Sequence, residues 1–288
     1  MPISLVKLND GNSIPWIGYG TGTALFKQDC EKLVVSAIHS GFTHIDGAQM
    51  YSNENSLGAG VVSSGKSRTE LFVTTKLLQL GPGQSVRDTL VKSLQELKTD
   101  YVNLFLVHTP TNFVGRLKET WKEMEAVKAE GLAKSIGVSN FRQKELEVIL
   151  GNATIIPAVN QIEFHPHLYK EERELVEYNR ERGIVTSSFG GLSPLFRSPG
   201  SAVDELAKSI AARLSKETGQ AVSDSQVLLL WAKKRGIVVI TTSTKTERMK
   251  EYLHADKLPE LTDDDVASID EAGSLETHRH FSGFYPKD

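Results

Sequence analysis

The chain has one cysteine, Cys30, no strong charge of either sign and no long apolar run. One cysteine excludes an intrachain disulfide and fits a reducing compartment such as the cytoplasm. A formal net charge of −3 gives no basic surface for nucleic acid or an anionic membrane. No segment approaches the ~20 apolar residues of a membrane span, and residues 1–7 do not resemble a signal peptide. These absences predict a cytoplasmic protein that acts on small molecules, without nucleic acid or membrane partners.

The sequence also lacks a linker, a composition shift and a heptad repeat. We therefore expect one domain over residues 1–288, and a monomer. Apolar runs typical of strands alternate with amphipathic stretches typical of helices. The expected strands are 16–18, 42–46, 71–76, 101–108, 133–138, 158–164, 184–189 and 237–241. The expected helices include 29–40, 85–97, 114–129, 143–150, 170–182, 201–218 and 223–235.

This alternation indicates a parallel sheet, and eight units of about 30 residues match a (β/α)₈ TIM barrel. A doubly wound open sheet is the competing fold, but it normally needs fewer strands before a second domain begins. Residues 5–8 and 13–17 read as an N-terminal β-hairpin around an Asp10-Gly11 turn. A Gly/Pro/Ser-rich loop, 190–200, interrupts the period and is expected to elaborate the binding site.

Four ionisable residues lie at or just after the ends of expected strands. Asp46, Lys76 and His108 each close such a run, and Tyr51 lies five residues after Asp46. Charged groups at the ends of buried strands are costly unless they meet one another or a ligand. The carboxyl ends of barrel strands form the catalytic face, so we expect the four side chains to converge there.

Together, these four groups suit the reduction of a carbonyl. A free phenol titrates near ~10, and an ammonium at Lys76 would lower the pKa of Tyr51 toward that of a useful proton donor. Asp46 would pair with Lys76, and His108 would hydrogen-bond a substrate carbonyl. Taken singly, such a lysine is usually a solvated loop residue and such a tyrosine a surface aromatic. Their joint placement favours a catalytic site.

Segment 42–54, which carries Asp46 and Tyr51, resembles the aldo-keto reductase segment with that family's catalytic Asp and Tyr. Lys76 and His108 fall where the family places the other two members of its tetrad. Segments 137–141 and 160–161 are similar to its nicotinamide-carboxamide motifs. The resemblance implies a (β/α)₈ barrel, NADPH, and hydride transfer to a small-molecule carbonyl with Tyr51 as the acid. It also implies nicotinamide contacts from Asp46, Ser139, Asn140 and Gln161.

Gly20, Thr21 and Thr23 match the stretch that lines the family's cofactor site after the first strand. A rival interpretation as a dinucleotide fingerprint fails because position 23 is Thr rather than Gly. Phe189 stands where many members stack a Tyr on the nicotinamide. The backbone amides around Leu192 and Ser193 are expected to cradle the pyrophosphate.

The stretch after the last strand departs from the family pattern. Thr242 replaces the Lys that usually grips the 2′-phosphate, while Arg248 keeps its place and can clamp a phosphate. We therefore expect NADPH rather than NADH. The residues implied in holding its adenosine phosphate are Thr242, Ser243, Thr244, Lys245, Arg248, Glu251 and Tyr252.

Thr109 replaces a Trp common in the family and Gly47 replaces a commoner Thr, and both changes open space. The pattern resembles a fungal branch that reduces conjugated polyketones, α-keto lactones and α-keto amides. An aromatic-rich tail, 276–285, is implied to fold over the barrel mouth. The expected substrate residues are Trp16, Met50, Thr109 and Phe113.

Other functions are less well supported. The pairs His165/His167 and His278/His280 have no Cys or carboxylate partner at convincing spacing, so no metal site is expected. A cofactor-binding, redox-sensing regulatory subunit with little turnover is the main alternative function. An isomerase or aldolase that uses Lys76 as a Schiff-base amine is a third, which pairing with Asp46 would disfavour because a charged amine is a poor nucleophile.

Overall fold

The computed structural model describes residues 3–284, so Tyr285 of the expected tail lies outside the described residues. Eight parallel strands form a closed barrel, and they confirm the predicted (β/α)₈ fold. In barrel order they are β10 (Val238–Thr241), β3 (Ile17–Gly20), β4 (His44–Asp46), β5 (Phe72–Leu77), β6 (Val102–Val107), β7 (Ala133–Ser139), β8 (Val159–Glu163) and β9 (Val185–Phe189). Each overlaps an expected strand.

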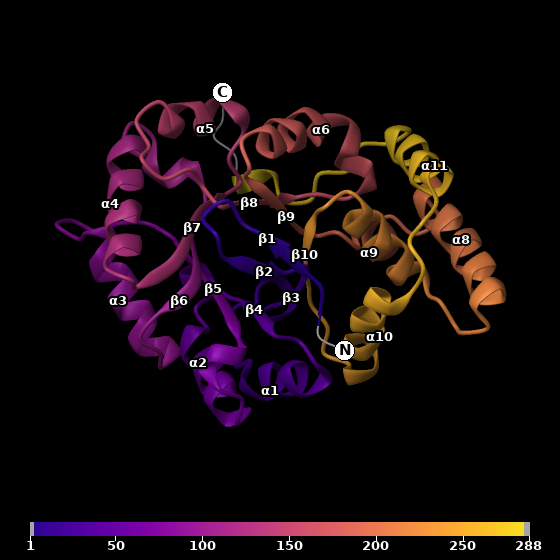
Figure 1. The fold of residues 1–288 in the computed structure, drawn as a ribbon, viewed down its shortest axis with the longest axis horizontal. Helices are drawn as coiled ribbons and strands as arrows, with labels where there is room; N and C mark the ends of the chain where they lie inside the picture. The colour runs from indigo at the N-terminus through magenta and orange to yellow at the C-terminus, as the bar shows by residue number, and fades with distance from the viewer. Residues whose placement is uncertain (1–2, 285–288) are drawn as a thin grey trace.

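Helices surround the barrel, and two of them, α8 and α11, lie outermost (Figure 1). The α-helices are α1 (Glu31–Ser40), α2 (Glu54–Ser63), α3 (Val86–Leu97), α4 (Leu117–Ala129), α5 (Gln143–Leu150), α6 (Pro166–Glu181), α7 (Ser193–Arg197), α8 (Ala202–Thr218), α9 (Asp224–Lys234), α10 (Thr246–His254) and α11 (Asp263–Ser274). Short 3₁₀ turns are η1 (Thr23–Leu25), η2 (Gln49–Tyr51), η3 (Arg68–Glu70), η4 (Pro110–Phe113), η5 (Ala255–Lys257) and η6 (Ser282–Phe284). Within residues 3–284, no helix combines the length and apolarity needed to cross a membrane.

The expected helices omitted α2, α7, α10 and α11, and the one that matches α6 began four residues late. Helix α2 contains Gly58 and Gly60, which lower helix propensity. In the fold they let α2 approach its neighbours, because a Cβ at Gly58 would collide with the Leu97 backbone and one at Gly60 with Val34. Helix α7 begins inside the expected irregular loop, where Pro194 occupies its first turn.

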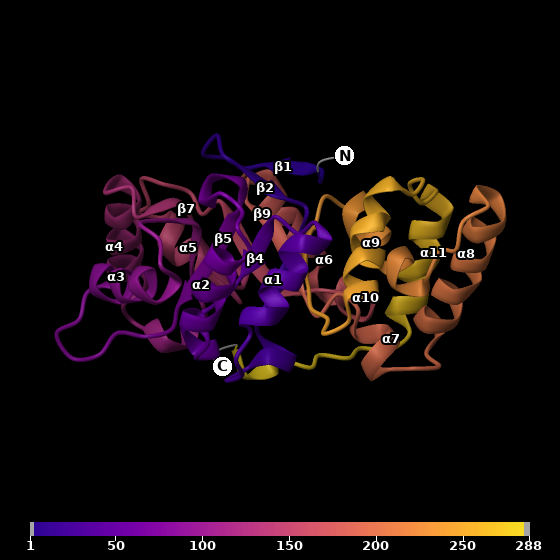
Figure 2. The same ribbon diagram turned by 90° about the horizontal axis from the view of Figure 1, so that it is seen from below.

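The N-terminal hairpin closes one end of the barrel. Its strands, β1 (Leu5–Lys7) and β2 (Ser13–Pro15), pair antiparallel as predicted. Leu8 and Ile14 are buried in an apolar cluster that includes Phe72, Leu104 and Val159 from the barrel strands. Figure 2 shows the hairpin and the C-terminal segment at opposite ends of the barrel. The hairpin therefore seals the amino-terminal end and leaves the carboxyl ends of the strands available for a site.

Glycine is required at position 137 on β7, where the neighbouring strand β8 leaves no room for a Cβ. A Cβ there would overlap the Val159 carbonyl oxygen. We predict that Gly137→Ala lowers the free energy of unfolding by about 1–3 kcal/mol, the usual cost of overpacking, as measured by urea denaturation. Gly151→Ala is the matched control, because Gly151 has helical φ of −61° and its added Cβ would meet Glu147 O at an ordinary 3.5 Å. Equal stability of the two variants would contradict this packing.

Candidate active site

A cavity of about 450 Å³ opens at the carboxyl ends of the barrel strands. Its walls bring together residues from most of the strands and from the loop after β9, as expected for this end of a (β/α)₈ barrel. The sequence-predicted residues that line it are Gly20, Thr23, Asp46, Met50, Tyr51, His108, Ser139, Asn140, Gln161, Phe189, Leu192, Ser193, Thr242 and Tyr252.

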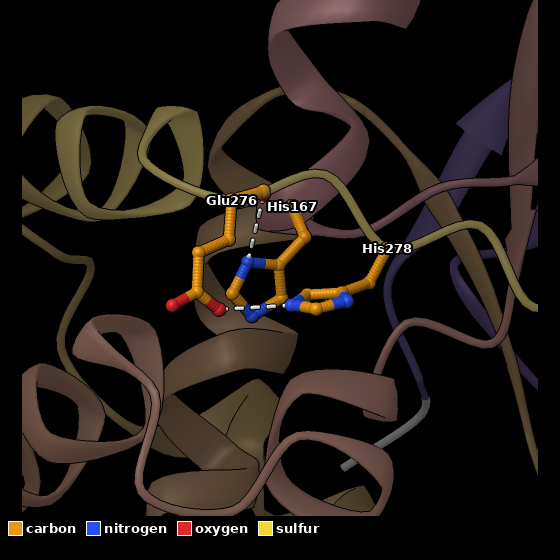
Figure 3. A group of neighbouring side chains, drawn as sticks. All are labelled: His167, Glu276 and His278. Atoms are coloured by element: carbon orange, nitrogen blue, oxygen red, sulfur yellow. Dashed lines mark hydrogen bonds and ion pairs between the residues drawn. The ribbon is translucent and has the colours of Figure 1, made fainter.

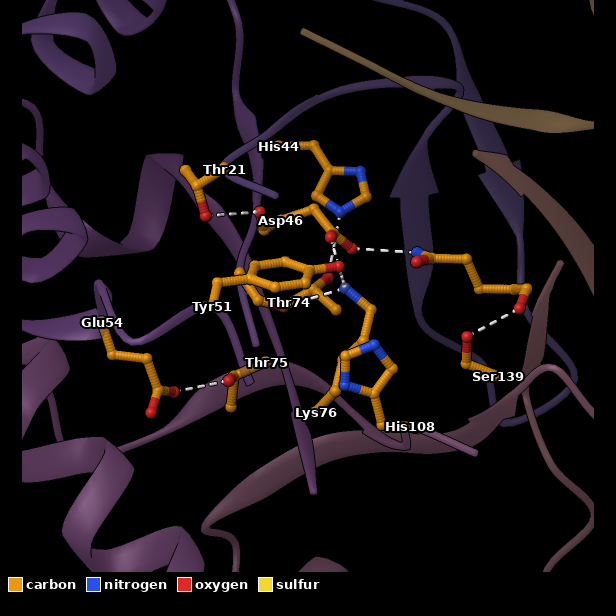
Figure 4. Close-up of polar contacts among 12 residues, drawn as sticks. Thr21, His44, Asp46, Tyr51, Glu54, Thr74, Thr75, Lys76, His108 and Ser139 are labelled. Atoms are coloured by element: carbon orange, nitrogen blue, oxygen red, sulfur yellow. Dashed lines mark hydrogen bonds and ion pairs between the residues drawn. The ribbon is translucent and has the colours of Figure 1, made fainter. Parts of the chain in front are cut away.

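An ion pair at the base of the cavity joins Lys76 on β5 to Asp46 on β4 (Figure 4). Both side chains are almost completely buried. The Lys76 ammonium also donates to the Gly47 carbonyl oxygen at 2.9 Å and to the Tyr51 hydroxyl at 3.5 Å. Parallel pairing of the two strands in adjacent register places these residues together. Three of the four predicted catalytic residues, Asp46, Tyr51 and Lys76, thus meet around one ammonium group.

Burial and neighbouring charges together set the pKa values of Tyr51 and Lys76. Burial raises the pKa of the Tyr51 phenol, and the Lys76 ammonium opposes this rise without overcoming it. The expected net lowering of the Tyr51 pKa was therefore wrong. Burial lowers the pKa of Lys76, but Asp46 and Tyr51 raise it by more, so Lys76 is held as an ammonium. The phenol is accordingly held protonated beside a fixed positive charge.

His108 is a neutral imidazole beside this group. Burial, and then the nearby Lys76 charge, lower the pKa of His108 to about 3. Its ring meets the Tyr51 ring edge-on at a centroid distance of 5.6 Å. Its Nδ1 has no hydrogen-bond partner among the described residues. A neutral ring at this place can hydrogen-bond a carbonyl oxygen without competing with Tyr51 as an acid.

An amide-lined wall faces the same cavity. Gln161 Nε2 donates to Asp46 Oδ2 at 2.9 Å, and Ser139 Oγ donates to the Gln161 carbonyl oxygen at 2.7 Å. Asn140 has a left-handed φ of 61° and donates from Nδ2 to the His108 carbonyl oxygen at 2.8 Å. Asn140 Oδ1 is buried and has no partner within residues 3–284. This acceptor fits the amide hydrogens of a nicotinamide carboxamide.

A glycine and a phenylalanine that line the cavity could accommodate a planar ring between them. A Cβ at Gly20 would lie 2.8 Å from Ile240 Cγ2, so only glycine leaves the wall open there. Phe189, at the end of β9, offers an aromatic face. The chain turns at Gly190, with φ of 70°, and carries Leu192 and Ser193 past the same cavity. These features fit the nicotinamide and pyrophosphate of a dinucleotide.

Most of the residues expected at the adenosine phosphate do not line the cavity and lie just before or within α10, whereas Thr242 and Tyr252 do line it. Arg248 is exposed, and its guanidinium lies 5.3 Å from the ring centroid of Phe196, which lines the cavity. Glu251 already accepts a hydrogen bond from Ser223 Oγ at 2.6 Å. The expected residues that do not line the cavity are Ser243, Thr244, Lys245, Arg248 and Glu251.

Comparisons with known proteins agree with this geometry. The model of the Aldo/keto reductase family matches residues 16–274. The chain belongs to the aldo-keto reductase family. It is 41% identical over 280 residues to an NAD/NADP-dependent indole-3-acetaldehyde reductase of Schizosaccharomyces pombe, with 94% of each chain covered. It is 37% identical over 276 residues to a glyoxal reductase of Bacillus subtilis, again with 94% of each covered.

Solved structures of the family share this architecture. A Bombyx mori aldo-keto reductase in complex with NADP superposes with a TM-score of 0.82 at 30% identity, covering 94% of this chain and 93% of that one. An aldo/keto reductase of Brucella melitensis gives a TM-score of 0.80 at 33% identity, covering 94% and 99%. The family, the barrel and the oxidoreductase class predicted from the sequence are thereby confirmed.

Several expected site residues of this reductase lie outside the cavity. Trp16 is buried just before β3, at the amino-terminal end of the barrel, where the Lys233 ammonium lies 5.1 Å from its ring. Its assignment to the substrate pocket was wrong because it lies at the opposite end of the barrel strand. Phe113 is buried in η4 and does not line the cavity. Thr21 is buried too, and its hydroxyl instead donates to the Asp46 carbonyl oxygen at 3.1 Å.

Other residues around the site were not singled out from the sequence. Phe26 and Phe196 line the cavity, alongside Phe281 and Phe284 of the tail, which the resemblance had implied would fold over the barrel mouth. Glu54 is buried behind the site and accepts hydrogen bonds from Thr75 and Ser93. No periodic pattern marks the aromatic positions, because they lie in segments without a regular sequence period.

Glu54 generates a pH prediction for this reductase. Burial raises its pKa from 4.5 to about 7. Between these values the unfolded chain releases the proton first, so the stability contributed by the neutral carboxyl is lost as pH rises from about 4.5 to about 7. Glu54→Gln mimics the neutral form at every pH. From pH 5 to pH 8, its free energy of unfolding should therefore rise relative to that of wild type by about 2–3 kcal/mol.

Urea denaturation at both pH values measures this difference. The control is Glu247→Gln, at an exposed position in the first turn of α10. A constant offset between wild type and Glu54→Gln across the pH range would contradict the assignment.

Proposed function

We propose that this protein is an NADPH-dependent reductase that converts an aldehyde or activated ketone to an alcohol, with Tyr51 as the general acid. The proposal rests chiefly on one observation. The Tyr51 hydroxyl lies 3.5 Å from the buried Lys76 ammonium, at a cavity that also presents neutral His108. A protonated phenol, a fixed cation and a neutral imidazole around one point suit the protonation of a carbonyl oxygen.

The cofactor proposal follows from the amide wall and the aromatic face. Asn140 Oδ1, Ser139 and Gln161 would hold the carboxamide, and Phe189 would cover the nicotinamide ring. The bound reduced nicotinamide supplies the hydride. The NADP complex of the Bombyx mori neighbour and the NAD/NADP-dependent Schizosaccharomyces pombe relative support this choice. Arg248, beside Phe196 at the cavity edge, would hold the 2′-phosphate.

The side chains of the tetrad have separate tasks. His108 orients the substrate carbonyl oxygen toward Tyr51, and the Tyr51 phenol gives its proton to that oxygen. The Lys76 ammonium then stabilises the phenolate that remains. Asp46 keeps Lys76 charged and fixed, while the buried setting strengthens each of these interactions. Because the Lys76 amine is held as an ammonium by Asp46, it is a poor nucleophile for a Schiff base.

We propose an α-dicarbonyl, conjugated polyketone or ketopantoyl-lactone-like molecule as the substrate. The cavity has an aromatic rim that includes Phe26, Phe281 and Phe284, which suits flat conjugated compounds. Position 109 carries a small Thr rather than an aromatic side chain. The Bacillus subtilis relative is a glyoxal reductase, and glyoxal is itself an α-dicarbonyl.

Replacing the general acid tests the reaction. Tyr51→Phe should lower kcat about 10²–10⁴-fold, because the proton donor is lost while the ring remains. NADPH oxidation measured with a panel of α-dicarbonyls and aldehydes reads this out. Tyr178→Phe on α6 is the matched control, since Tyr178 does not line the cavity. Full activity of Tyr51→Phe, or no turnover of any substrate by wild type, would contradict the proposal.

Cofactor choice makes a separate prediction. Arg248→Ala should raise the KM for NADPH about 10- to 100-fold and leave the KM for NADH unchanged, because only NADPH carries the 2′-phosphate. Arg116→Ala, at the start of α4 on the far side of the barrel, should change neither value (Figure 1). Equal KM values for the two cofactors in wild type would refute the NADPH preference.

A further inference from the structure

Two His-x-His segments that are far apart in the sequence meet beside the barrel. His165 and His167 lie at the start of α6, and His278 and His280 lie in the C-terminal tail. The fold places the His167 and His278 rings 4.9 Å apart, and adds Glu276 to them. The expectation that no carboxylate accompanies these histidines was therefore wrong.

We propose that His167, Glu276 and His278 form a site for a divalent transition metal, with Zn²⁺ as the best-matched ion, that fastens the tail to α6. The potential ligand atoms of these three residues all lie within 4.8 Å of one another. Tetrahedral Zn²⁺ with bonds of about 2.1 Å needs its ligands about 3.4 Å apart, so small side-chain rotations suffice. Figure 3 shows the two imidazoles and the carboxylate turned toward a common point.

His167 is the residue of the three that is best prepared to bind a metal. Its side chain is 2% exposed, and its Nδ1 lies 3.2 Å from the Glu276 carbonyl oxygen. A carbonyl oxygen only accepts, so Nδ1 carries the hydrogen and Nε2 presents a lone pair. That Nε2 is buried, has no partner among residues 3–284, and lies beside the Glu276 carboxylate and His278 (Figure 3). Metal-binding histidines commonly donate their other N–H to a backbone carbonyl in this way.

The other two ligands complete a familiar donor set. His278 Nε2 and Glu276 Oε2 lie 2.8 Å apart and share a proton. When a metal binds, the hydrogen of the neutral His278 ring moves from Nε2 to Nδ1, which leaves a lone pair on Nε2 beside those of the Glu276 carboxylate. Two imidazoles and a carboxylate hold Zn²⁺ in known proteins with water as the fourth ligand. Imidazole donors favour Zn²⁺ and its transition-metal neighbours over Mg²⁺ or Ca²⁺.

The site sits at the root of the segment that reaches the active-site cavity. Beyond His278, the backbone amides of His280 and Phe281 donate to the Glu163 carboxylate at 2.8 and 3.0 Å. Phe284 then stacks on His108, with ring centroids 5.6 Å apart and planes inclined by 15°. A metal bound by Glu276 and His278 therefore adds a cross-link where the tail leaves α11, and holds the tail across the mouth of the barrel.

Zinc titration of the full-length, tag-free protein tests the site. Competition with a chromophoric chelator should give one tight Zn²⁺ per chain, and Co²⁺ should give the visible absorption of a four-coordinate centre. Glu276→Gln and His278→Gln should each weaken Zn²⁺ binding by at least about tenfold. Glu276 is exposed and His278 partly exposed, so neither variant should unfold. His254→Gln, a histidine outside the cluster on α10, should bind as wild type does.

Amide hydrogen exchange tests the fastening of the tail. Zn²⁺ should slow exchange at His280 and Phe281 in wild type and leave it unchanged in Glu276→Gln. Undiminished affinity in both Glu276→Gln and His278→Gln would overturn the metal site. Zinc binding that requires these residues without slowing exchange in the tail would overturn the fastening. Neither measurement depends on turnover, so both are distinct from the test of the reductase function.

Discussion

The buried ion pair between Lys76 and Asp46 is the constraint on which the site depends. An ammonium with no exposed surface persists only if its charge is compensated, and removing one partner of such a pair typically costs roughly 3–5 kcal/mol. Asp46 is itself held by the Gln161 amide from β8, so the pair ties three barrel strands together. Burial and the Lys76 charge together keep His108 neutral, and the same charge opposes the rise that burial causes in the pKa of Tyr51. Removing the ion pair would therefore disturb both the packing of the barrel and the protonation states of the groups in the cavity.

The two ends of the barrel differ in structure, and each is covered by a different end of the chain. The N-terminal hairpin covers one end, and the C-terminal tail reaches the other. Leu8 and Ile14 of the hairpin fill the amino-terminal end with apolar side chains, which leaves no room for chemistry there. The carboxyl ends instead carry a cavity with polar groups at its base and aromatic rings at its rim. The tail reaches this rim through polar contacts with Glu163 and aromatic contacts with Phe189. The apolar contacts of the hairpin thus lie at one end of the barrel, and the cavity lies at the other.

The sequence was enough to predict that the tetrad residues converge, because residues at the carboxyl ends of parallel barrel strands lie at the same end of the barrel. Asp46, Lys76 and His108 needed no knowledge of loops to be placed on one face. The same reasoning misplaced Trp16, since a residue before a strand lies at the opposite end from one after it. It also missed the meeting of His167 with Glu276, because two residues 109 positions apart in the sequence give no periodic signal. The pKa of Tyr51 was predicted in the wrong direction because burial, which outweighs the Lys76 charge, is a property of the assembled site.

The tail also accounts for the small residue at position 109. In the resembled family pattern an aromatic side chain follows the catalytic histidine, and here Thr109 leaves that wall short. Phe284 stacks on His108, and its carbonyl oxygen accepts a hydrogen bond from the Thr109 hydroxyl. An aromatic wall is therefore restored from a segment 175 residues away in sequence. A wall built on a separable tail can move with its anchor, whereas a Trp at position 109 would be fixed to the barrel. Whatever fastens the tail at Glu276 and His278 therefore acts on the shape of the cavity that Phe284 lines.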